Sequence, residues 1–498
     1  MKAGFKSLVW LTVLMLMSIG IFGVAAADVE EDIEDLNDRI DALELKTAKN
    51  KVSFFGDFRV KYDYLKYEYP EYYQYMGGDP MDPASYAQMP ASELSNDEAW
   101  SARLRLKIDA RPTRELHFTG RLNMHTAYGG SRVPIFNGFP NTVAFGANST
   151  SYPSDNTLRV ERAAFTYDPD EMPLFFTFGR QASTNGPPRE LREDRVRQGT
   201  PGALMIDAEI DGVMLGIHLD ELGLPEGSNW RFCYGTGFES GFGSGGNVAQ
   251  AMVNTPGGPM AISGLNDTKV AGFCFETNIP AIPGKTLFSG GYFRLIDLTD
   301  IATGYTRNFP DGTNSDPQLV TSTRNLGDMD LYGACFQHEH KGFSWFGSVA
   351  FNKSHPDVGA ASMYGFGSLL GNPSESESGM AYYVGSQIPI SAINAKVGIE
   401  YNHGDATWFS FTHAADDYSM SKLATRGSVI EAYYIQQIEK KFNFRAGIQI
   451  YTYDYAFSGW HIAPGPIEQM FDLANTPSLA YAFPDKATNI YAILDMDF

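Results

Sequence analysis

Basic residues occupy every second position in two short stretches near the start of the chain, and a third stretch contains one more. The basic residues of these stretches are Arg59, Lys61, Arg103, Arg105, Lys107 and Arg121. The acids on the same faces are fewer, namely Asp57, Asp63 and Asp109. Because successive side chains of a β-strand point to opposite sides, this spacing puts the charges on one face of each strand. A face with excess positive charge can attract and steer charged solutes.

A second set of charges is concentrated in one stretch that follows Pro187 and Pro188. The charged residues there are Arg189, Glu190, Arg192, Glu193, Asp194, Arg195 and Arg197. We predict a short helix at this place, because proline is favoured in the first turn of a helix. Such a helix would carry four arginines and three acids within a few residues of one another.

The positions between the basic residues are apolar, and this alternation of period two recurs along most of the chain. It begins in 52–64, 100–110 and 116–124. Strands of about ten residues with one apolar face are typical of transmembrane barrels. Thirteen further strands are expected near 158–167, 174–180, 210–219, 229–236, 268–277, 286–295, 328–337, 343–352, 379–389, 395–403, 425–436, 442–453 and 486–498.

The connections between these sixteen strands alternate in length. The short ones are 111–115, 168–173, 220–228, 278–285, 338–342, 390–394 and 437–441. The long ones are 65–98, 129–157, 181–209, 237–267, 296–327, 353–378, 404–424 and 454–485. This pattern is typical of outer-membrane barrels, with short periplasmic turns and long outer loops. In lipid the sheet must close, because an open edge leaves backbone groups unpaired. The sequence therefore predicts an all-β fold, a 16-stranded antiparallel transmembrane β-barrel over residues 50–498.

The residues before the barrel show two other patterns. Residues 1–27 have a positive start, an apolar core and the small residues Ala25, Ala26 and Ala27, which together are typical of a secretory signal peptide. Residues 28–49 have an apolar seam with the spacing of a short coiled coil. The seam residues are Val29, Ile33, Leu36, Ile40 and Leu43. A single helix this short is marginal alone, so it needs a partner. Either three protomers meet through it on the periplasmic side, or it packs on its own barrel.

Composition excludes several classes of protein. The net charge of −21 argues against a nucleic-acid partner. The slightly negative mean hydropathy excludes a bundle of apolar membrane helices. The three cysteines, Cys233, Cys274 and Cys335, have no metal- or haem-binding spacing. Hydrolase and nucleotide-binding motifs are absent, so the sequence predicts neither an enzyme nor a cofactor or metal site.

The carboxy-terminal strand carries a resemblance to a known group of proteins. Its apolar face consists of Ile490, Ala492, Leu494, Met496 and Phe498 and ends in an aromatic residue. This resembles the signal, here Ile490, Leu494, Met496 and Phe498, that the barrel-assembly machinery reads in bacterial outer-membrane proteins. Residues 174–181 and 211–213 are similar to the porin strands that flank the third outer loop. In architecture residues 28–498 resemble a porin family with an N-terminal coiled coil, similar to general and phosphate-selective porins.

The resemblance implies an exported porin of the Gram-negative outer membrane, a homotrimer surrounded by lipid. Its water-filled channel would pass small hydrophilic solutes or ions by diffusion. The basic face would line the pore, and the stretch 189–197 would fold into it as the constriction loop. Loop and wall would then either create a transverse field or simply pair their charges. The basic wall suggests a mild preference for anions, which the acidic outer loops would oppose.

Two alternatives to an open pore remain. The first is a plugged structural barrel that serves as an adhesin, an envelope tether or a sheath for electron carriers. The second, an outer-membrane hydrolase, lacks a recognisable catalytic triad. Tyrosines also crowd the first long loop, namely Tyr67, Tyr69, Tyr72, Tyr73 and Tyr75. They fit either a sugar-binding track or an aromatic girdle at the membrane interface, of which the girdle is favoured.

Overall fold

The computed structural model describes most of the predicted barrel. The described residues are 52–78, 82–129, 156–182, 189–194, 202, 204–238, 251–255, 258–262, 266–308, 314–357, 369–372, 374–412, 421–455 and 483–498. The chain divides into two compact units, one of residues 1–52 with 111–114 and one of 53–110 with 115–498. The second unit is the barrel. The signal peptide and coiled coil predicted for 1–49 lie outside the described residues.

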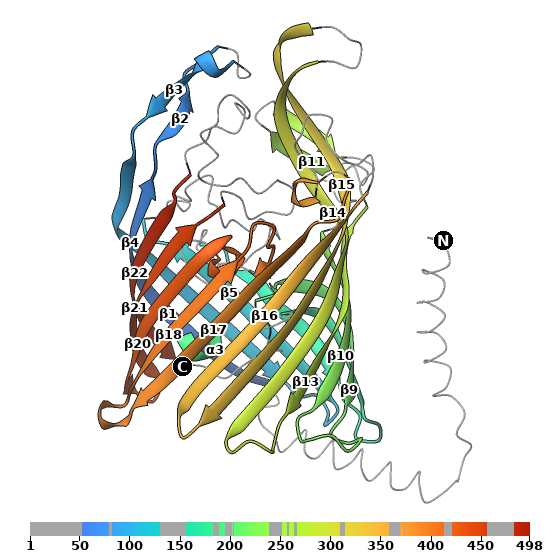
Figure 1. Cartoon of the computed structure of the whole chain (residues 1–498). Coiled ribbons are helices and arrows are strands. Elements are labelled where there is room, and N and C mark those ends of the chain that lie inside the picture. The colour runs from blue at the N-terminus through green and yellow to red at the C-terminus, as the bar shows by residue number, and fades with distance from the viewer. Residues whose placement is uncertain are drawn as a thin grey trace, which may run out of the picture. The chain divides into compact units, whose positions relative to one another are not determined.

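Sixteen antiparallel strands close into one barrel (Figure 1). In chain order they are β1 (Val52–Tyr69), β4 (Ser92–Ala110), β5 (Leu116–Ala127), β6 (Arg159–Tyr167), β7 (Leu174–Ala182), β9 (Glu209–His218), β10 (Asn229–Phe238), β13 (Thr268–Asn278), β14 (Lys285–Asn308), β15 (Asn314–His340), β16 (Phe343–Pro356), β17 (Ser378–Ile390), β18 (Ala395–Gly404), β20 (Gly427–Glu439), β21 (Phe442–Tyr453) and β22 (Lys486–Asp497). Each strand pairs with the next one along the barrel, and all sixteen predicted strands are confirmed.

The last strand closes the barrel against the first. β22 runs antiparallel to β1, with Asp497 opposite Asp57. One residue further, Gly56 and Phe498 exchange two backbone hydrogen bonds of 3.0 Å. A side chain at position 56 would lie 2.6 Å from the Phe498 ring, so glycine is required where the ring crosses β1. The predicted pairing of the carboxy-terminal strand with the strand that begins near Val52 is confirmed.

The two faces of the wall differ in polarity, as the alternation predicts. On β1, Arg59 and Lys61 are buried inside the barrel, whereas Val60 and Tyr62, which alternate with them, point outward. The outer face exposes large apolar side chains on many strands. Examples are Leu106, Phe165, Trp230, Phe232, Trp345, Phe351, Ile399, Ile450, Ile490, Leu494 and Met496. Such a surface is unfavourable in water and suits the interior of a bilayer.

Two hairpins extend further than the sequence predicts. β14 and β15 remain paired as far as Asn308 and Asn314, so most of the connection predicted at 296–327 is strand. Likewise β1 and β4 extend into the connection predicted at 65–98, which ends in a small sheet of β2 (Tyr72–Tyr75) and β3 (Tyr86–Met89). Beyond the bilayer no lipid selects apolar residues on one face, so strands there lose the alternation that identifies them.

The interior of the barrel contains chain from the long connections. Short elements there are α3 (Arg189–Arg192), β8 (Ile206–Asp207), η3 (Leu369–Gly371), β19 (Phe411–Thr412) and η5 (Lys422–Ala424). β8 and β19 pair in parallel, although they come from different connections. Near one end of the barrel, Tyr67 is completely buried in a cluster with Tyr451, Tyr453 and Phe483. Tyr67 therefore belongs neither to a sugar-binding track nor to a lipid-facing girdle. Among the described residues, no helix is long and apolar enough to cross a membrane.

Candidate pore constriction

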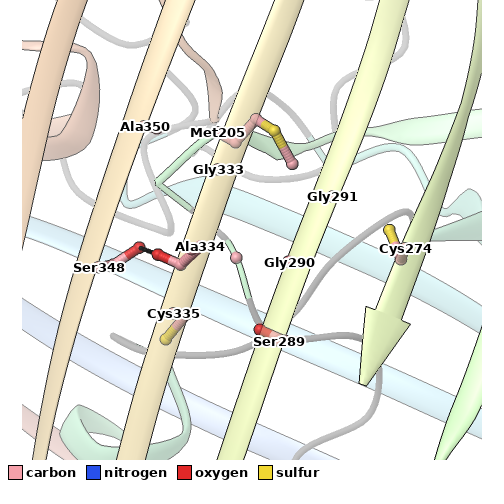
Figure 2. Close-up of a pocket in the computed structure, with 11 residues that line it drawn as sticks. Met205, Cys274, Ser289, Gly290, Gly291, Gly333, Ala334, Cys335, Ser348 and Ala350 are labelled. Atoms are coloured by element: carbon pink, nitrogen blue, oxygen red, sulfur yellow. Dashed lines mark hydrogen bonds between the residues drawn. The ribbon is translucent and has the colours of Figure 1, made fainter. Parts of the chain in front are cut away.

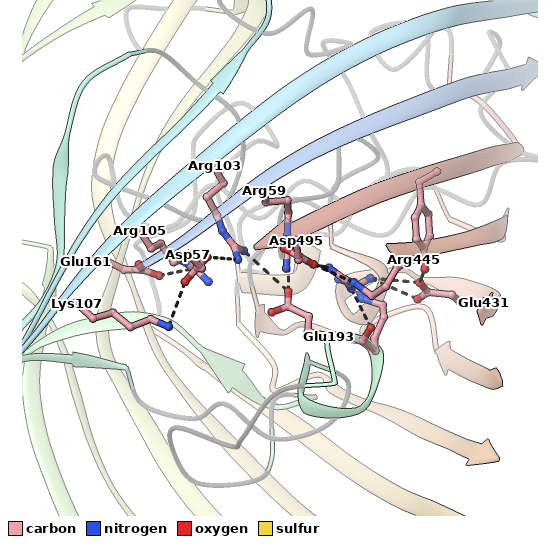
Figure 3. A network of polar contacts seen from close by, with 12 residues as sticks. Asp57, Arg59, Arg103, Arg105, Lys107, Glu161, Glu193, Glu431, Arg445 and Asp495 are labelled. Atoms are coloured by element: carbon pink, nitrogen blue, oxygen red, sulfur yellow. Dashed lines mark hydrogen bonds and ion pairs between the residues drawn. The ribbon is translucent and has the colours of Figure 1, made fainter. Parts of the chain in front are cut away.

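Ion pairs connect the inner face of the wall from β4 through β1 to β22 (Figure 3). Arg59 on β1 binds Asp495 on β22 at 2.7 Å. Arg103 on β4 donates to Asp57 on β1 at 2.9 Å. Lys107, four residues further along β4, lies 3.1 Å from the other oxygen of Asp57. Each cation thus meets its carboxylate on the neighbouring strand, as residues that share one face of a sheet do.

The other predicted wall cations are also paired with carboxylates of the inner face. Arg105 and Arg121 both bind Glu161 on β6, at 3.0 and 2.6 Å. Lys61 lies 2.8 Å from Asp63 on its own strand. All six residues that the sequence assigns to the pore wall therefore point into the barrel and contact a carboxylate. Five are buried, and Lys107, with 18% of its side chain exposed, is the most accessible of them.

The charge-dense stretch after Pro187 and Pro188 does enter the barrel. The predicted short helix is confirmed as α3, which includes Arg189 and Glu190. Beyond its end, Glu193 accepts a hydrogen bond of 3.2 Å from Arg59 on β1. Arg195 and Arg197 lie outside the described residues, and of the side chains of Arg189 and Glu190 nothing is described.

Strands on the other side of α3 hold its backbone. Arg445 on β21 donates to the carbonyl of Arg192 at 2.9 Å, and Gln387 on β17 donates to the carbonyl of Leu191 at 2.7 Å. Asp194 forms an ion pair with Lys396 on β18. These contacts fix α3 against the arc of seven strands from β4 to β17. The segment therefore narrows the interior next to the charged wall.

At Glu193, a charge of the loop meets charges of the wall in direct ion pairs. Its carboxylate lies against Arg59 and 4.0 Å from Arg103, with no open lumen between them. Buried charges of this kind are stable only when each has a partner, because desolvation of a lone charge is costly. Among the described residues of this network, the cations outnumber the carboxylates. The paired cations are Arg59, Lys61, Arg103, Arg105, Lys107, Arg121, Arg192, Lys422 and Arg445. The carboxylates that they bind are Asp57, Asp63, Glu161, Glu193, Glu400, Glu431 and Asp495, two fewer.

Several members of this network are not among the residues that the sequence singles out. Glu431 and Arg445 lie at inward positions of β20 and β21, and Asp495 at an inward position of β22. The alternation that identifies Arg59 and Arg103 also applies to these strands and would have found them. Lys422 comes from a long connection without periodicity, and no sequence signal places it in the barrel.

A second structure inside the barrel is apolar, and we call it the lumen core. Its residues from the connections are Leu191, Leu204, Met205, Ile206, Ala208, Leu369, Leu370, Trp408, Phe409, Phe411 and Leu423. They pack on apolar inward residues of the wall, such as Phe293, Leu331 and Phe346. Trp408 is completely buried, and its indole N–H donates to the carbonyl of Leu423 at 2.9 Å. The lumen core fills part of the space that the sequence predicts to hold water.

The predicted assembly signal lies on the outer face of the barrel. Ile490, Leu494, Met496 and Phe498 are all exposed there, and Phe498 is half exposed. Their alternation with the buried Tyr491 and Asp495 follows the pleat of β22. These side chains are therefore accessible from the outside of the barrel.

Comparisons with known proteins give one family and a set of similar structures. The model of a family described as "Protein of unknown function (DUF3373)" matches residues 93–498. No curated protein matches the sequence.

The similar solved structures are bacterial outer-membrane proteins. OprB of Pseudomonas putida, in its high-pH structure, is 10% identical with a TM-score of 0.46, over 92% of this chain and 96% of its own. The anion-selective porin from Comamonas acidovorans is 11% identical with a TM-score of 0.45, over 90% and 99%. OmpF of Salmonella typhi, in complex with daunomycin, is 10% identical with a TM-score of 0.41, over 90% and 97%.

Proposed function

We propose that this chain, which belongs to the DUF3373 family of proteins of unknown function, forms a channel in the outer membrane of a Gram-negative bacterium. Small hydrophilic solutes and ions diffuse passively along the charged wall, past α3, with a mild preference for anions. The observation that carries this proposal is the row of inward cations on β1, β4 and β5, beside which α3 narrows the interior of the barrel.

The excess of cations over carboxylates supports the preference for anions. In a narrow, partly desolvated passage, fixed charge acts on passing ions more strongly than it does in bulk water. The paired residues cancel most of that charge, so the preference is mild. Lys107 contributes most directly, since part of its side chain reaches open space.

Ion selectivity in a planar bilayer tests this function. In a KCl gradient the wild-type channel is expected to show a reversal potential of the sign that indicates chloride permeation. Lys107→Gln removes one positive charge from the wall and should shift that potential toward zero. Lys269→Gln is the matched control, because Lys269 lies on the outward side of β13 beside Asp267. A cation preference in wild type, or equal shifts in both variants, would refute the proposed role of the wall.

The outer membrane is the proposed location for three reasons that support one another. The chain begins with a segment typical of a signal peptide, the barrel has an apolar outer face, and its last strand ends in an exposed Phe498. Export, lipid contact and recognition by the barrel-assembly machinery belong together in this proposal. The preceding segment 28–49 would lie in the periplasm.

A homotrimer is the proposed assembly, with contacts through the barrel walls and the seam residues of 28–49. Removal of residues 28–49 after the signal peptide should lower the molar mass of the detergent-solubilised particle or weaken its resistance to dissociation. Light scattering with the detergent contribution subtracted measures this directly. A full-length protein that is monomeric would show instead that residues 28–49 pack on their own barrel.

The lumen core favours a second candidate function, that of a plugged barrel without general pore activity. Trp408, Phe409 and Phe411 are completely or almost completely buried in the interior, as residues of a folded domain are. A barrel filled in this way would serve as an adhesin, an envelope tether or a sheath for electron carriers. Conductance distinguishes the two functions, because a plugged barrel is silent in the bilayer.

A further inference from the structure

Two separate segments inside the barrel bind the same wall carboxylate. Glu431, on β20, is completely buried. Arg192, at the end of α3, places a guanidinium nitrogen 3.4 Å from both of its oxygens. Lys422 of η5 forms an ion pair with one of those oxygens. A third contact comes from the wall, where the Tyr491 hydroxyl donates to Glu431 at 2.7 Å.

The two segments enter the interior from different connections. α3 belongs to the connection between β7 and β9, and η5 to the one between β18 and β20. Lys422 also binds Glu400 on β18, which accepts a hydrogen bond of 2.7 Å from Tyr383. Glu431 is therefore a charged contact through which the position of each segment depends on the other.

We propose that Glu431 is a positioning residue that holds α3 and η5 against the wall and thereby sets the width of the passage. This inference rests on the proposed channel function. The physical reason is charge balance: without its negative charge, Arg192 and Lys422 would lie close together in a desolvated place with fewer carboxylates to bind. The two segments would then separate from β20 or from each other.

The lumen core connects η5 to a part of the wall that carries natural reporters. Leu423 binds Trp408 through the indole N–H, and Phe411 of β19 pairs with Ile206 of β8. Met205, which precedes Ile206, lies over β14 and β15, where Gly291 and Gly333 leave room for its side chain. Displacement of η5 therefore weakens the packing of Met205 on the wall.

Two thiols that form no disulfide lie in the wall near Met205. Cys274 and Cys335, with Met205, Ser289 and Ser348, line a small cavity between the lumen core and strands β13 to β16 (Figure 2). Both cysteines are almost completely buried. Because a thiol must be accessible to react with a water-soluble reagent, their labelling rate reports how often the lumen core leaves the wall.

The experiment compares three variants of the full-length protein in detergent and in bilayers. Glu431→Gln removes the charge and keeps the shape, and Glu431→Asp keeps the charge on a shorter side chain. Glu161→Gln is the control for labelling, because Arg105 and Arg121, which bind Glu161, are wall residues that belong to neither segment. A water-soluble maleimide labels the thiols, mass spectrometry of peptides measures Cys274 and Cys335 separately, and single-channel conductance is recorded in parallel.

Glu431→Gln is expected to speed the labelling of Cys274 and Cys335 by at least about tenfold, the change in an opening equilibrium for about 1.4 kcal/mol. It should also raise the conductance. Glu431→Asp should restore most of the wild-type behaviour, and Glu161→Gln should leave labelling unchanged. If Glu431→Gln does not form a folded barrel, Lys422→Gln replaces it, with faster labelling again expected.

The outcomes separate this inference from the proposed function. Labelling in Glu431→Gln equal to that in wild type, in folded protein, overturns the positioning role whether or not the channel conducts. Faster labelling with unchanged conductance overturns the claim that Glu431 sets the passage width. Faster labelling in a barrel that is silent in all variants sustains the positioning of the lumen core but refutes the open channel.

Discussion

Replacement of Trp408 by alanine should loosen the lumen core without opening the barrel wall. The indole is completely buried among residues of three connections, and large-to-small changes of this kind cost about 3–5 kcal/mol. Loss of the hydrogen bond to Leu423 adds roughly 1 kcal/mol. The sixteen strands pair through their own backbone and do not depend on Trp408. The whole cost therefore falls on the association of residues 404–412 and 421–426 with the wall.

Amide hydrogen exchange measured by mass spectrometry detects this change segment by segment. A loss of about 4 kcal/mol corresponds to roughly a thousandfold shift in local opening, so exchange in peptides of 404–412 and 421–426 should accelerate by two to three orders of magnitude at most. Peptides of β13 to β16 should exchange as in wild type. Trp100→Ala is the matched control, since Trp100 is exposed on the outer side of β4 and should leave both segments unchanged. Unchanged exchange of these segments in Trp408→Ala, or an equal acceleration in the wall strands, would refute this prediction.

Two further predictions concern the closure of the barrel and the buried charges. Deletion of Phe498 removes the ring packed on Gly56 and the last backbone pair of the barrel. It should lower the yield of folded barrel in the outer membrane, measured by heat-modifiable mobility in gels. The folded fraction should keep its ion selectivity, and altered selectivity would contradict this prediction. Asp495→Asn leaves Arg59 and Arg445 without their shared carboxylate and should destabilise the barrel by about 3–5 kcal/mol in denaturant titrations, and a variant as stable as wild type would show that water already reaches this pair.

The wall was predictable from the sequence because lipid and water impose opposite demands on successive residues. Val60 faces lipid and Arg59 faces the interior, so apolar and polar residues alternate along each strand. That constraint ends where the bilayer ends. The continuation of β14 and β15 beyond it depends on backbone pairing, such as that of Thr303 with Thr321, in stretches where apolar and polar residues do not alternate.

The interior was predictable only where it repeats the logic of the wall. The cations of β1, β4 and β5 followed from alternation, and the helix α3 from its prolines. The lumen core did not, because Met205, Trp408 and Leu423 come from connections without period, and only tertiary packing brings them together. Local sequence contains no signal for a contact between β8 and β19, which are separated by some two hundred residues of chain.

Single-channel recording of the purified wild-type protein tests the central claim most directly. With a panel of salts, we expect discrete conductance steps that are larger for small anions than for bulky ones, because α3 narrows the passage beside the cationic wall. A folded barrel that remains silent in every salt would contradict the claim. The lumen core would then close the interior, and the protein would be a structural barrel.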